Sequence, residues 1–163
     1  MWRKSLSVVA LFLITSIQAR AENWVTVSHI TYQGREHFEL VDSDSIIREG
    51  NVITYWQMDK GGINDDMANS KLATGETVGY IQIQKRLDCG GMWEIETGLR
   101  RRVDPTTGKR LHEWRMSEEY LEKSKKYYLP GTVGISKAQT ICGLDTPKPT
   151  PPKPKQEQPL QRI

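Results

Sequence analysis

The sequence predicts an α+β domain in which antiparallel strands are followed by a C-terminal helix. Polar and apolar residues alternate over several stretches, turn residues separate these stretches, and apolar residues near the C-terminus recur at a helical spacing. The chain also has two cysteines, Cys89 and Cys142, which we expect to tie the final helix to the sheet.

The first 21 residues have the features of a secretory signal peptide. Two basic residues precede an apolar run at 6–17, and residues 19–21 form an A-x-A cleavage site. The run is shorter than the roughly 20 residues that span a bilayer, so we expect no membrane span and an exported protein that starts at Glu22. Because Glu22 is not a cysteine, we also expect no lipid anchor. The expected location is the periplasm, the cell surface or the medium.

The rest of the chain is predicted to form one domain and a tail. The domain is expected over residues 22–145. Residues 146–163 are rich in proline and lysine, since six of the eight prolines lie here, and they predict a disordered, extended tail that acts as a spacer or contacts an anionic surface. Three basic residues of the signal account for the formal charge of +3, so the mature protein is balanced and no nucleic-acid partner is expected.

The first strands are expected to form a hairpin. Residues 24–32 are rich in β-branched and aromatic types, and residues 37–41 follow after a turn. Turn and capping residues at 42–45 lead to a third strand at 51–58. Three tryptophans at alternating strand positions are predicted to lie in the core: Trp24, Trp56 and Trp93.

Residues 59–76 are expected to form a long mobile loop. They contain three glycines and two adjacent aspartates but few large apolar residues. Loops of this length often carry function, so this one is a candidate binding segment.

The clearest alternation lies in residues 78–89. It places Ile81, Ile83, Leu87 and Cys89 on one face, which we expect to be the core face.

The end of the domain combines two further strands with helical segments. Strands at 92–103 and 110–116 flank a strong turn, and a short charged helical turn follows at 117–126. The final helix is expected over residues 132–142, after Pro130-Gly131.

The two cysteines are most simply paired with each other in an oxidising compartment. A catalytic thiol or a metal pair are the alternatives. Against both, no C-x-x-C motif occurs and the three histidines lie far from both cysteines in the sequence.

Several short motifs follow one another in an order that resembles a known family, the bacterial surface-adhesin protein E-like proteins. The resemblance covers roughly residues 24–143. It rests on the strand at Trp24 and on Asp42 to Ile46, Gly50-Asn51-Val52, the strand at Trp56, Leu87-Asp88-Cys89 and Pro130-Gly131-Thr132 before Cys142.

This resemblance implies a sheet of about six antiparallel strands with a C-terminal helix tethered by a disulfide, at positions that match Cys89 and Cys142. The family's founding member is lipid-anchored, forms a dimer and binds host matrix proteins, so the resemblance implies adhesion and allows a homodimer. The present sequence departs from it by lacking the lipid-anchor cysteine and by carrying the Pro-Lys tail.

The sequence has no motif for catalysis or for metal binding. Neither G-x-S-x-G nor H-E-x-x-H occurs, and His29, His37 and His112 lie on separate predicted strands. A metal or acid–base pair of His29 and His37 across the first hairpin is the alternative to ordinary half-exposed strand histidines. Asp65-Asp66 lacks the calcium-loop pattern. We expect no catalytic residue, metal or cofactor.

Basic residues gather around the predicted turn at Pro105. They form a candidate binding patch for a protein or an anionic glycan or lipid, which consists of Arg100, Arg101, Arg102, Lys109, Arg110 and the neighbouring Trp114. Equally, these charges protect an exposed hairpin edge from aggregation.

The sequence therefore predicts an exported, non-enzymatic binding protein that resembles an adhesin and engages a macromolecular partner at the cell envelope or in the host matrix. The alternative is a periplasmic envelope or stress module, or an inhibitor of an envelope hydrolase that binds through residues 59–76.

Overall fold

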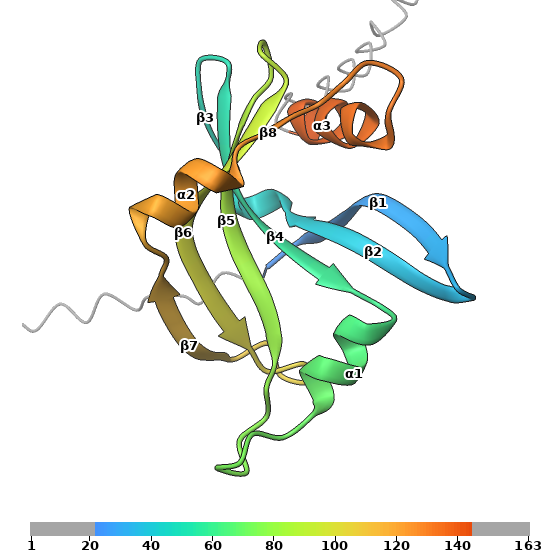
Figure 1. Cartoon of the computed structure of the whole chain (residues 1–163), viewed down its shortest axis with the longest axis vertical. Helices are drawn as coiled ribbons and strands as arrows, with labels where there is room; N and C mark the ends of the chain where they lie inside the picture. Colours follow the sequence, from blue (N-terminus) through green and yellow to red (C-terminus); the bar gives the residue numbers. More distant parts are fainter. Residues whose placement is uncertain (1–21, 145–163) are drawn as a thin grey trace, which may run out of the picture.

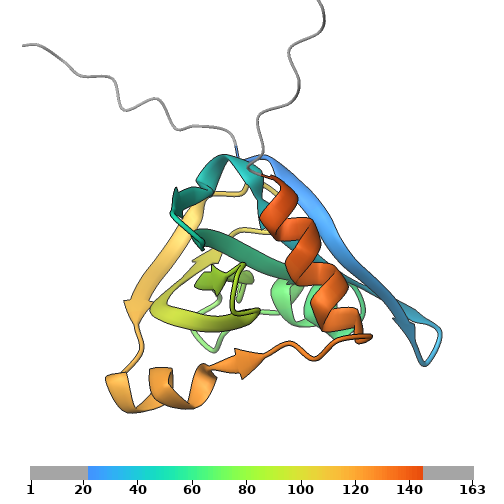
Figure 2. The same ribbon diagram turned by 90° about the horizontal axis from the view of Figure 1, so that it is seen from above.

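A computed structural model describes residues 22–144 of the chain (Figures 1 and 2). The predicted signal peptide at 1–21 and the predicted tail at 146–163 lie outside the described residues.

Within this part, strands dominate and the longest helix comes last. The elements in chain order are β1 (Trp24–Tyr32), β2 (Arg35–Asp42), the 3-10 turn η1 (Ser43–Ser45), β3 (Ile47–Glu49), β4 (Val52–Lys60), α1 (Ile63–Asn69), β5 (Tyr80–Asp88), β6 (Trp93–Val103), β7 (Arg110–Arg115), α2 (Glu118–Ser124), β8 (Lys126–Tyr127) and α3 (Val133–Leu144).

The strands form one antiparallel sheet in the order β1-β2-β4-β5-β6-β7. The short strands β3 and β8 pair with β4 and β6. Six ordered strands with a C-terminal helix confirm the predicted α+β fold class.

Local side-chain chemistry forms the turns between these strands. The Asp42 carboxylate accepts hydrogen bonds from the backbone N–H groups of Asn23 and Asp44 and so caps η1. At the β6–β7 turn, the Asp104 carboxylate accepts the backbone N–H groups of Thr106 and Thr107, and these bonds lower the pKa of Asp104. Both turns were predicted from these residue types.

Alternate residues of each strand lie on two faces of the sheet. We call the face that carries α3 the helix face. Ile53 and Leu87, paired across β4 and β5, lie on it. Met58 and Gln82, also paired, lie on the opposite face. The first core fills the space between the helix face and α3 and contains Val27, Val41, Ile53, Tyr55, Leu87, Ala138 and Ile141.

The core changes sides along β5. Near the end of the strand Leu87 is fully buried on the helix face, but near its start Gln82 on the opposite face is 1% exposed and Ile81 on the helix face is 42% exposed. The alternation is as predicted, but the expectation that Ile81 lies in the core is wrong. The second core, on the opposite face near α1, contains Met58, Ala68, Tyr80 and Val103.

The length of α3 explains why part of the helix face stays open. The helix has 12 residues, about 18 Å, and covers one end of that face (Figures 1 and 2). At the other end α1 packs through Ala68 on the second core. The three strand tryptophans expected in the core are only partly buried: Trp24, Trp56 and Trp93.

The prediction of a long mobile loop at 59–76 is also wrong, because this segment contains α1 and a bridge between Lys71 and Thr77. The helix begins after Gly61 and Gly62, whose φ values of +86° and +53° favour glycine. A side chain at Gly61 would also overlap the carbonyl oxygen of Glu36.

Contacts from outside α1 hold it in place. Asp65 Oδ1 accepts the backbone N–H of Gly61 at 2.8 Å and the hydroxyl of Tyr80 at 2.5 Å. These contacts come from the fold rather than from an apolar stripe, which explains why the periodicity of the sequence does not reveal the helix.

The predicted disulfide is present. It joins Cys89, just after β5, to Cys142 in α3, with the Cα atoms 5.9 Å apart. On the chain-entropy description, closing a loop of 53 residues contributes about 4 kcal/mol to stability. The disulfide thus fixes the end of α3 over the first core.

Candidate binding surfaces

The six residues of the predicted basic patch do not share one surface. Alternation along β6 places Arg100 and Arg102 on the helix face and Arg101 on the opposite face. Arg101 is 8% exposed, whereas Lys109 and Arg110 are exposed at the hairpin and Trp114 is half-buried.

Arg101 has a structural environment. Its guanidinium bonds to the Glu22 carboxylate at 2.6 Å and to the side-chain oxygen of Gln82, and it lies 4.1 Å from the centre of the Trp56 ring. Burial lowers the pKa of Arg101, which Glu22 opposes. An arginine that is buried and already bonded to Glu22 and Gln82 is not available to a ligand.

Two other arginines of the patch form ion pairs with carboxylates. Arg100 bonds to Glu96 at 2.7 Å and to the Tyr120 hydroxyl at 2.6 Å. Burial opposes charge on Arg100, but the bonds to Glu96 raise its pKa. Arg110 pairs with Glu113 at 3.2 Å.

Arg102 faces a separate hollow. It lines a cavity of about 310 Å³ together with Lys71, Glu76 and Asp104. Two basic and two acidic residues balance there, so this hollow does not favour an anionic ligand.

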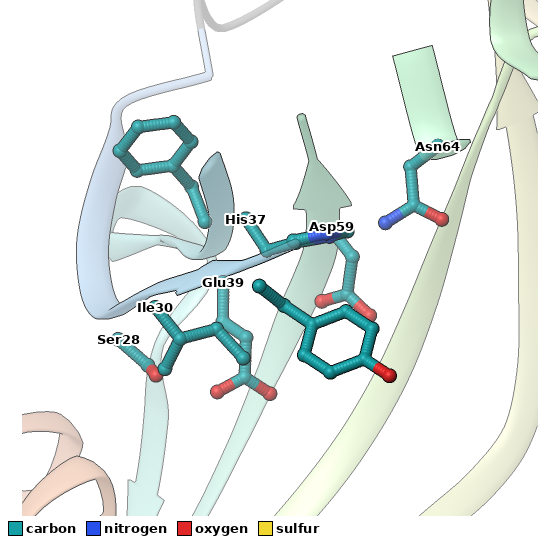
Figure 3. A pocket seen from close by; sticks show the side chains of 8 residues that line it. Ser28, Ile30, His37, Glu39, Asp59 and Asn64 are labelled. Carbon is teal, nitrogen blue, oxygen red and sulfur yellow. The ribbon is translucent and has the colours of Figure 1, made fainter. Parts of the chain in front are cut away.

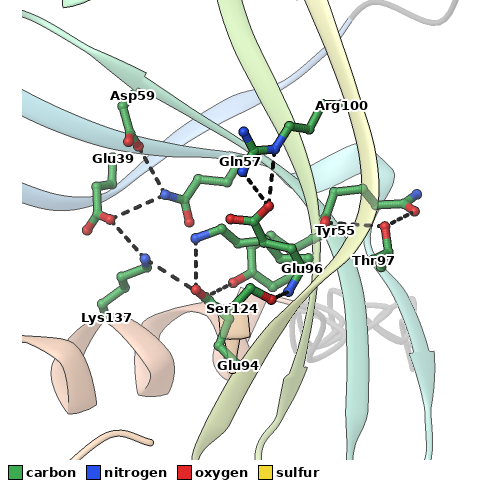
Figure 4. Close-up of polar contacts among 12 residues, drawn as sticks. Glu39, Tyr55, Gln57, Asp59, Glu94, Glu96, Thr97, Arg100, Ser124 and Lys137 are labelled. Carbon is green, nitrogen blue, oxygen red and sulfur yellow. Dashed lines mark hydrogen bonds and ion pairs between the residues drawn. The ribbon is translucent and has the colours of Figure 1, made fainter. Parts of the chain in front are cut away.

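A separate group of charged side chains, outside the predicted basic patch, lies buried beneath α3 (Figure 4). The Glu94 carboxylate accepts a hydrogen bond from the Tyr55 hydroxyl and pairs with Lys85 at 2.8 Å and with Lys137 of α3 at 3.9 Å. Burial acts to raise the pKa of Glu94, but the two lysines lower it to about 2. Burial and the neighbouring Glu94 raise the pKa of Tyr55.

This group joins α3 to the sheet. Lys137 also pairs with Glu39 of β2 at 2.9 Å, and Gln57 bonds to Glu39 at 3.3 Å. Because Glu94 is 3% exposed beneath the helix, it is out of reach of a substrate while α3 stays in place.

The open part of the helix face carries two adjoining hollows. The first, of about 310 Å³, lies over β1, β2 and β4 and is shown in Figure 3; its lining residues are Ser28, Ile30, Tyr32, His37, Phe38, Glu39, Asp59 and Asn64. The second, of about 200 Å³, extends over β5 to Arg100 of β6. Asp59 and Asn64 line both, so they form one continuous depression, which we call the sheet groove.

Apolar side chains surround the sheet groove. Ile30 and Tyr32 are exposed at its β1 end, Met67 of α1 forms part of its wall, and Ile81 lies at its β5 end. Ile63, at the start of α1, is exposed as well. Exposed apolar residues that gather around a depression are typical of binding surfaces.

The acidic residues of the groove differ in their partners. Figure 3 shows the carboxylates of Glu39 and Asp59 pointing to the same side of the strands. Glu39 is paired with Lys137. Asp59 accepts a hydrogen bond from Gln57 at 3.0 Å, and no lysine or arginine nitrogen of residues 22–144 forms an ion pair with it.

The two histidines of the first hairpin do not meet. His29 is paired with Phe38 and stacks on its ring at 4.5 Å, whereas His37 is paired with Ile30 and lines the groove. Adjacent register positions place them on opposite faces. In the described part of the chain, no group of three His, Cys, Asp or Glu side chains is placed to hold a metal ion.

The sequence pattern pointed to the basic hairpin and missed the sheet groove. The groove residues come from β1, β2, β4, α1 and β5, and their distance in the chain hides their proximity. One signal was present: the alternation of 78–89 provides isoleucines for the helix face over more length than one short helix can cover.

Comparison with known proteins finds no family model, no curated protein and no solved structure that matches this chain. None of the helices within residues 22–144 has the length and hydropathy that crossing a membrane requires. The Cys89–Cys142 disulfide indicates folding in an oxidising, extracytoplasmic compartment.

Proposed function

We propose that this protein is an exported, non-enzymatic binding protein that engages a macromolecular partner at the cell envelope or in the host matrix, as an adhesin does. The observation that carries the proposal is the sheet groove, in which exposed apolar side chains line a continuous depression. Its walls are fixed by the sheet and by α1, so a partner meets a prepared surface.

Two further features support this proposal. The disulfide agrees with an exported protein, and the sheet with a tethered C-terminal helix agrees with the resemblance to the surface-adhesin protein E-like family.

Site-specific photocrosslinking in intact cells tests the proposal. A photoreactive phenylalanine is placed at Ile81 in the groove or at Ile47 on β3, which is also exposed and lies outside the groove. We expect a discrete crosslinked adduct from position 81 and none from position 47. Equal labelling at both positions, or none at position 81, would contradict the proposal.

The location of the partner is tested on the same cells. If a protease added to intact cells digests this protein, the protein is exposed at the surface, as an adhesin is. Protection until osmotic shock indicates a periplasmic partner.

A second candidate function is inhibition of an envelope hydrolase through residues 59–76. The exposed Ile63 and Met67 of α1 favour it, because they form an apolar ridge beside the groove. Loss of hydrolase inhibition in an Ile63→Ser, Met67→Ser double variant is the expected result.

A further inference from the structure

The charges around the sheet groove indicate what kind of partner it fits. We propose that the groove binds an extended segment of a partner protein that places a lysine or arginine against Asp59 and apolar side chains on either side. This inference rests on the proposed function, since it specifies the partner of the same groove.

Asp59 is the first reason. It lies where the two hollows meet, its side chain is exposed, and it has no ion pair with a described lysine or arginine. The neighbouring Lys60 forms no ion pair with it: as the next residue of β4 it lies on the opposite face of the sheet, and its ammonium lies 4.9 Å from the ring centre of Tyr80. A cation from a partner would therefore meet a carboxylate that is free to form a charge-assisted hydrogen bond.

The basic residues beside the groove are the second reason. Three of them are already bound to carboxylates: Lys137 to Glu39 at 2.9 Å, Arg100 to Glu96 at 2.7 Å and Arg35 to Asp66 at 2.8 Å. An anionic partner would have to break one of these pairs and would also meet Asp59. The balance of charge favours a cationic partner.

The apolar residues set the length of the segment. Ile30 and Ile81 stand at the two ends of the groove, on strands that are three steps apart in the sheet. Three steps are about 14 Å, which four or five residues of extended chain span. Tyr32 adds an aromatic ring to the hollow that Asp59 also lines, and such rings attract cations.

Three fluorescent heptapeptides test the proposal on the full-length mature protein. They have the sequence Ser-Leu-Val-X-Val-Leu-Ser with lysine, norleucine or glutamate at X, and their binding is measured by fluorescence anisotropy. Norleucine keeps the length of the lysine stem without its charge. We expect the lysine peptide to bind at least about tenfold more tightly than the norleucine peptide.

Variants assign this preference to Asp59. Asp59→Asn keeps an acceptor for Gln57 and is expected to reduce the preference to within about twofold. Asp59→Lys is expected to reverse it in favour of the glutamate peptide. The matched control, Glu122→Gln, removes one exposed carboxylate from α2, outside the groove, and should leave the preference unchanged.

Several results would overturn the proposal. They are equal affinities of the lysine and norleucine peptides, a preference that survives Asp59→Asn, or no binding of any peptide. Binding of a peptide with the sequence of residues 146–163 in place of the lysine peptide would assign the groove to the chain's own basic tail. In each case, crosslinking from position 81 shows whether the groove still binds a partner, so failure of the charge preference is distinguished from failure of the proposed function.

Discussion

Two buried charged residues, Arg101 and Glu94, depend on ion pairs with residues that lie far from them in the sequence or on other elements. Arg101 depends on Glu22, 79 positions away in the chain, and Glu94 depends on Lys85 and on Lys137 of α3. A buried charge that loses its partner is costly, because the site cannot replace the solvation that water gave. The sequence shows these residues as ordinary surface charges, since their partners are known only from the fold.

Replacement of Glu22 tests the first of these contacts. Glu22→Ala leaves the guanidinium of Arg101 without its carboxylate, and we expect a loss of about 2 to 3 kcal/mol in the free energy of unfolding. Glu119→Ala is the control, because its pair with Lys123 is exposed and is expected to contribute less than about 1 kcal/mol. Urea unfolding followed by tryptophan fluorescence measures both. Equal losses would mean that the pair of Glu22 and Arg101 contributes no more to stability than an exposed ion pair.

The lowered pKa of Glu94 leads us to expect that the stability of the protein depends on pH. Its pKa in the folded protein is about 2, against an ordinary value of 4.5, so the unfolded chain takes up the proton first as the pH falls. The stabilisation is therefore complete above about pH 4.5 and is lost between that pH and 2. It corresponds to about 3 kcal/mol, from the size of the pKa shift.

The comparison with Glu94→Gln isolates this effect. At pH 7 the variant is expected to be less stable, because Lys85 and Lys137 lose a charged partner. Near pH 2.5 the difference should become much smaller, since Glu94 is then protonated in the unfolded chain and the pH is close to its pKa in the folded protein. Urea unfolding at both pH values gives the difference, and one that stays constant would exclude Glu94 as the titrating group.

At the scale of elements, local patterns predicted the strands well and the short helix poorly. The hairpin of β1 and β2, the alternation of β5 and the position of α3 follow from residue types and spacing. The seven-residue α1 does not, because it depends on the glycine pair at 61–62 and on the bond between Asp65 and Tyr80. A sequence pattern shows that a segment lacks an apolar stripe, but it does not show which contacts replace it.

Two glycine substitutions test how α1 is held. Gly61 and Gly75 have nearly equal φ values of +86° and +85°, but an added side chain meets the Glu36 carbonyl oxygen at Gly61 and nothing within 4 Å at Gly75. Gly75→Ala is expected to cost about 1 kcal/mol, from backbone strain alone. Gly61→Ala should cost clearly more, since the start of α1 must also move away from β2. Thermal unfolding measures both, and equal costs would show that α1 does not depend on this close approach.

At the scale of the whole molecule, the sheet buries different faces at its two ends. Glu22, just before β1, reaches Arg101 of β6 although β2, β4 and β5 lie between these strands, so the sheet curves strongly toward the face opposite α3. The second core forms there, and the far end of the helix face is left open as the sheet groove. Alternation predicted which residues share a face. It could not predict which end of that face is covered, because this depends on the reach of α3 and the curvature of the sheet.

Two residues of β5 test this change of sides within one strand. Leu87 and Ile81 lie six positions apart on the same face, and the first is fully buried while the second is 42% exposed. Leu87→Ala is expected to cost about 2 to 5 kcal/mol, because it leaves a cavity beneath α3. Ile81→Ala should cost less than about 1 kcal/mol, because its side chain borders the groove. Chemical denaturation of both variants makes the comparison: similar large losses would mean that the helix face is buried along its whole length, and the groove would then not be open to a partner.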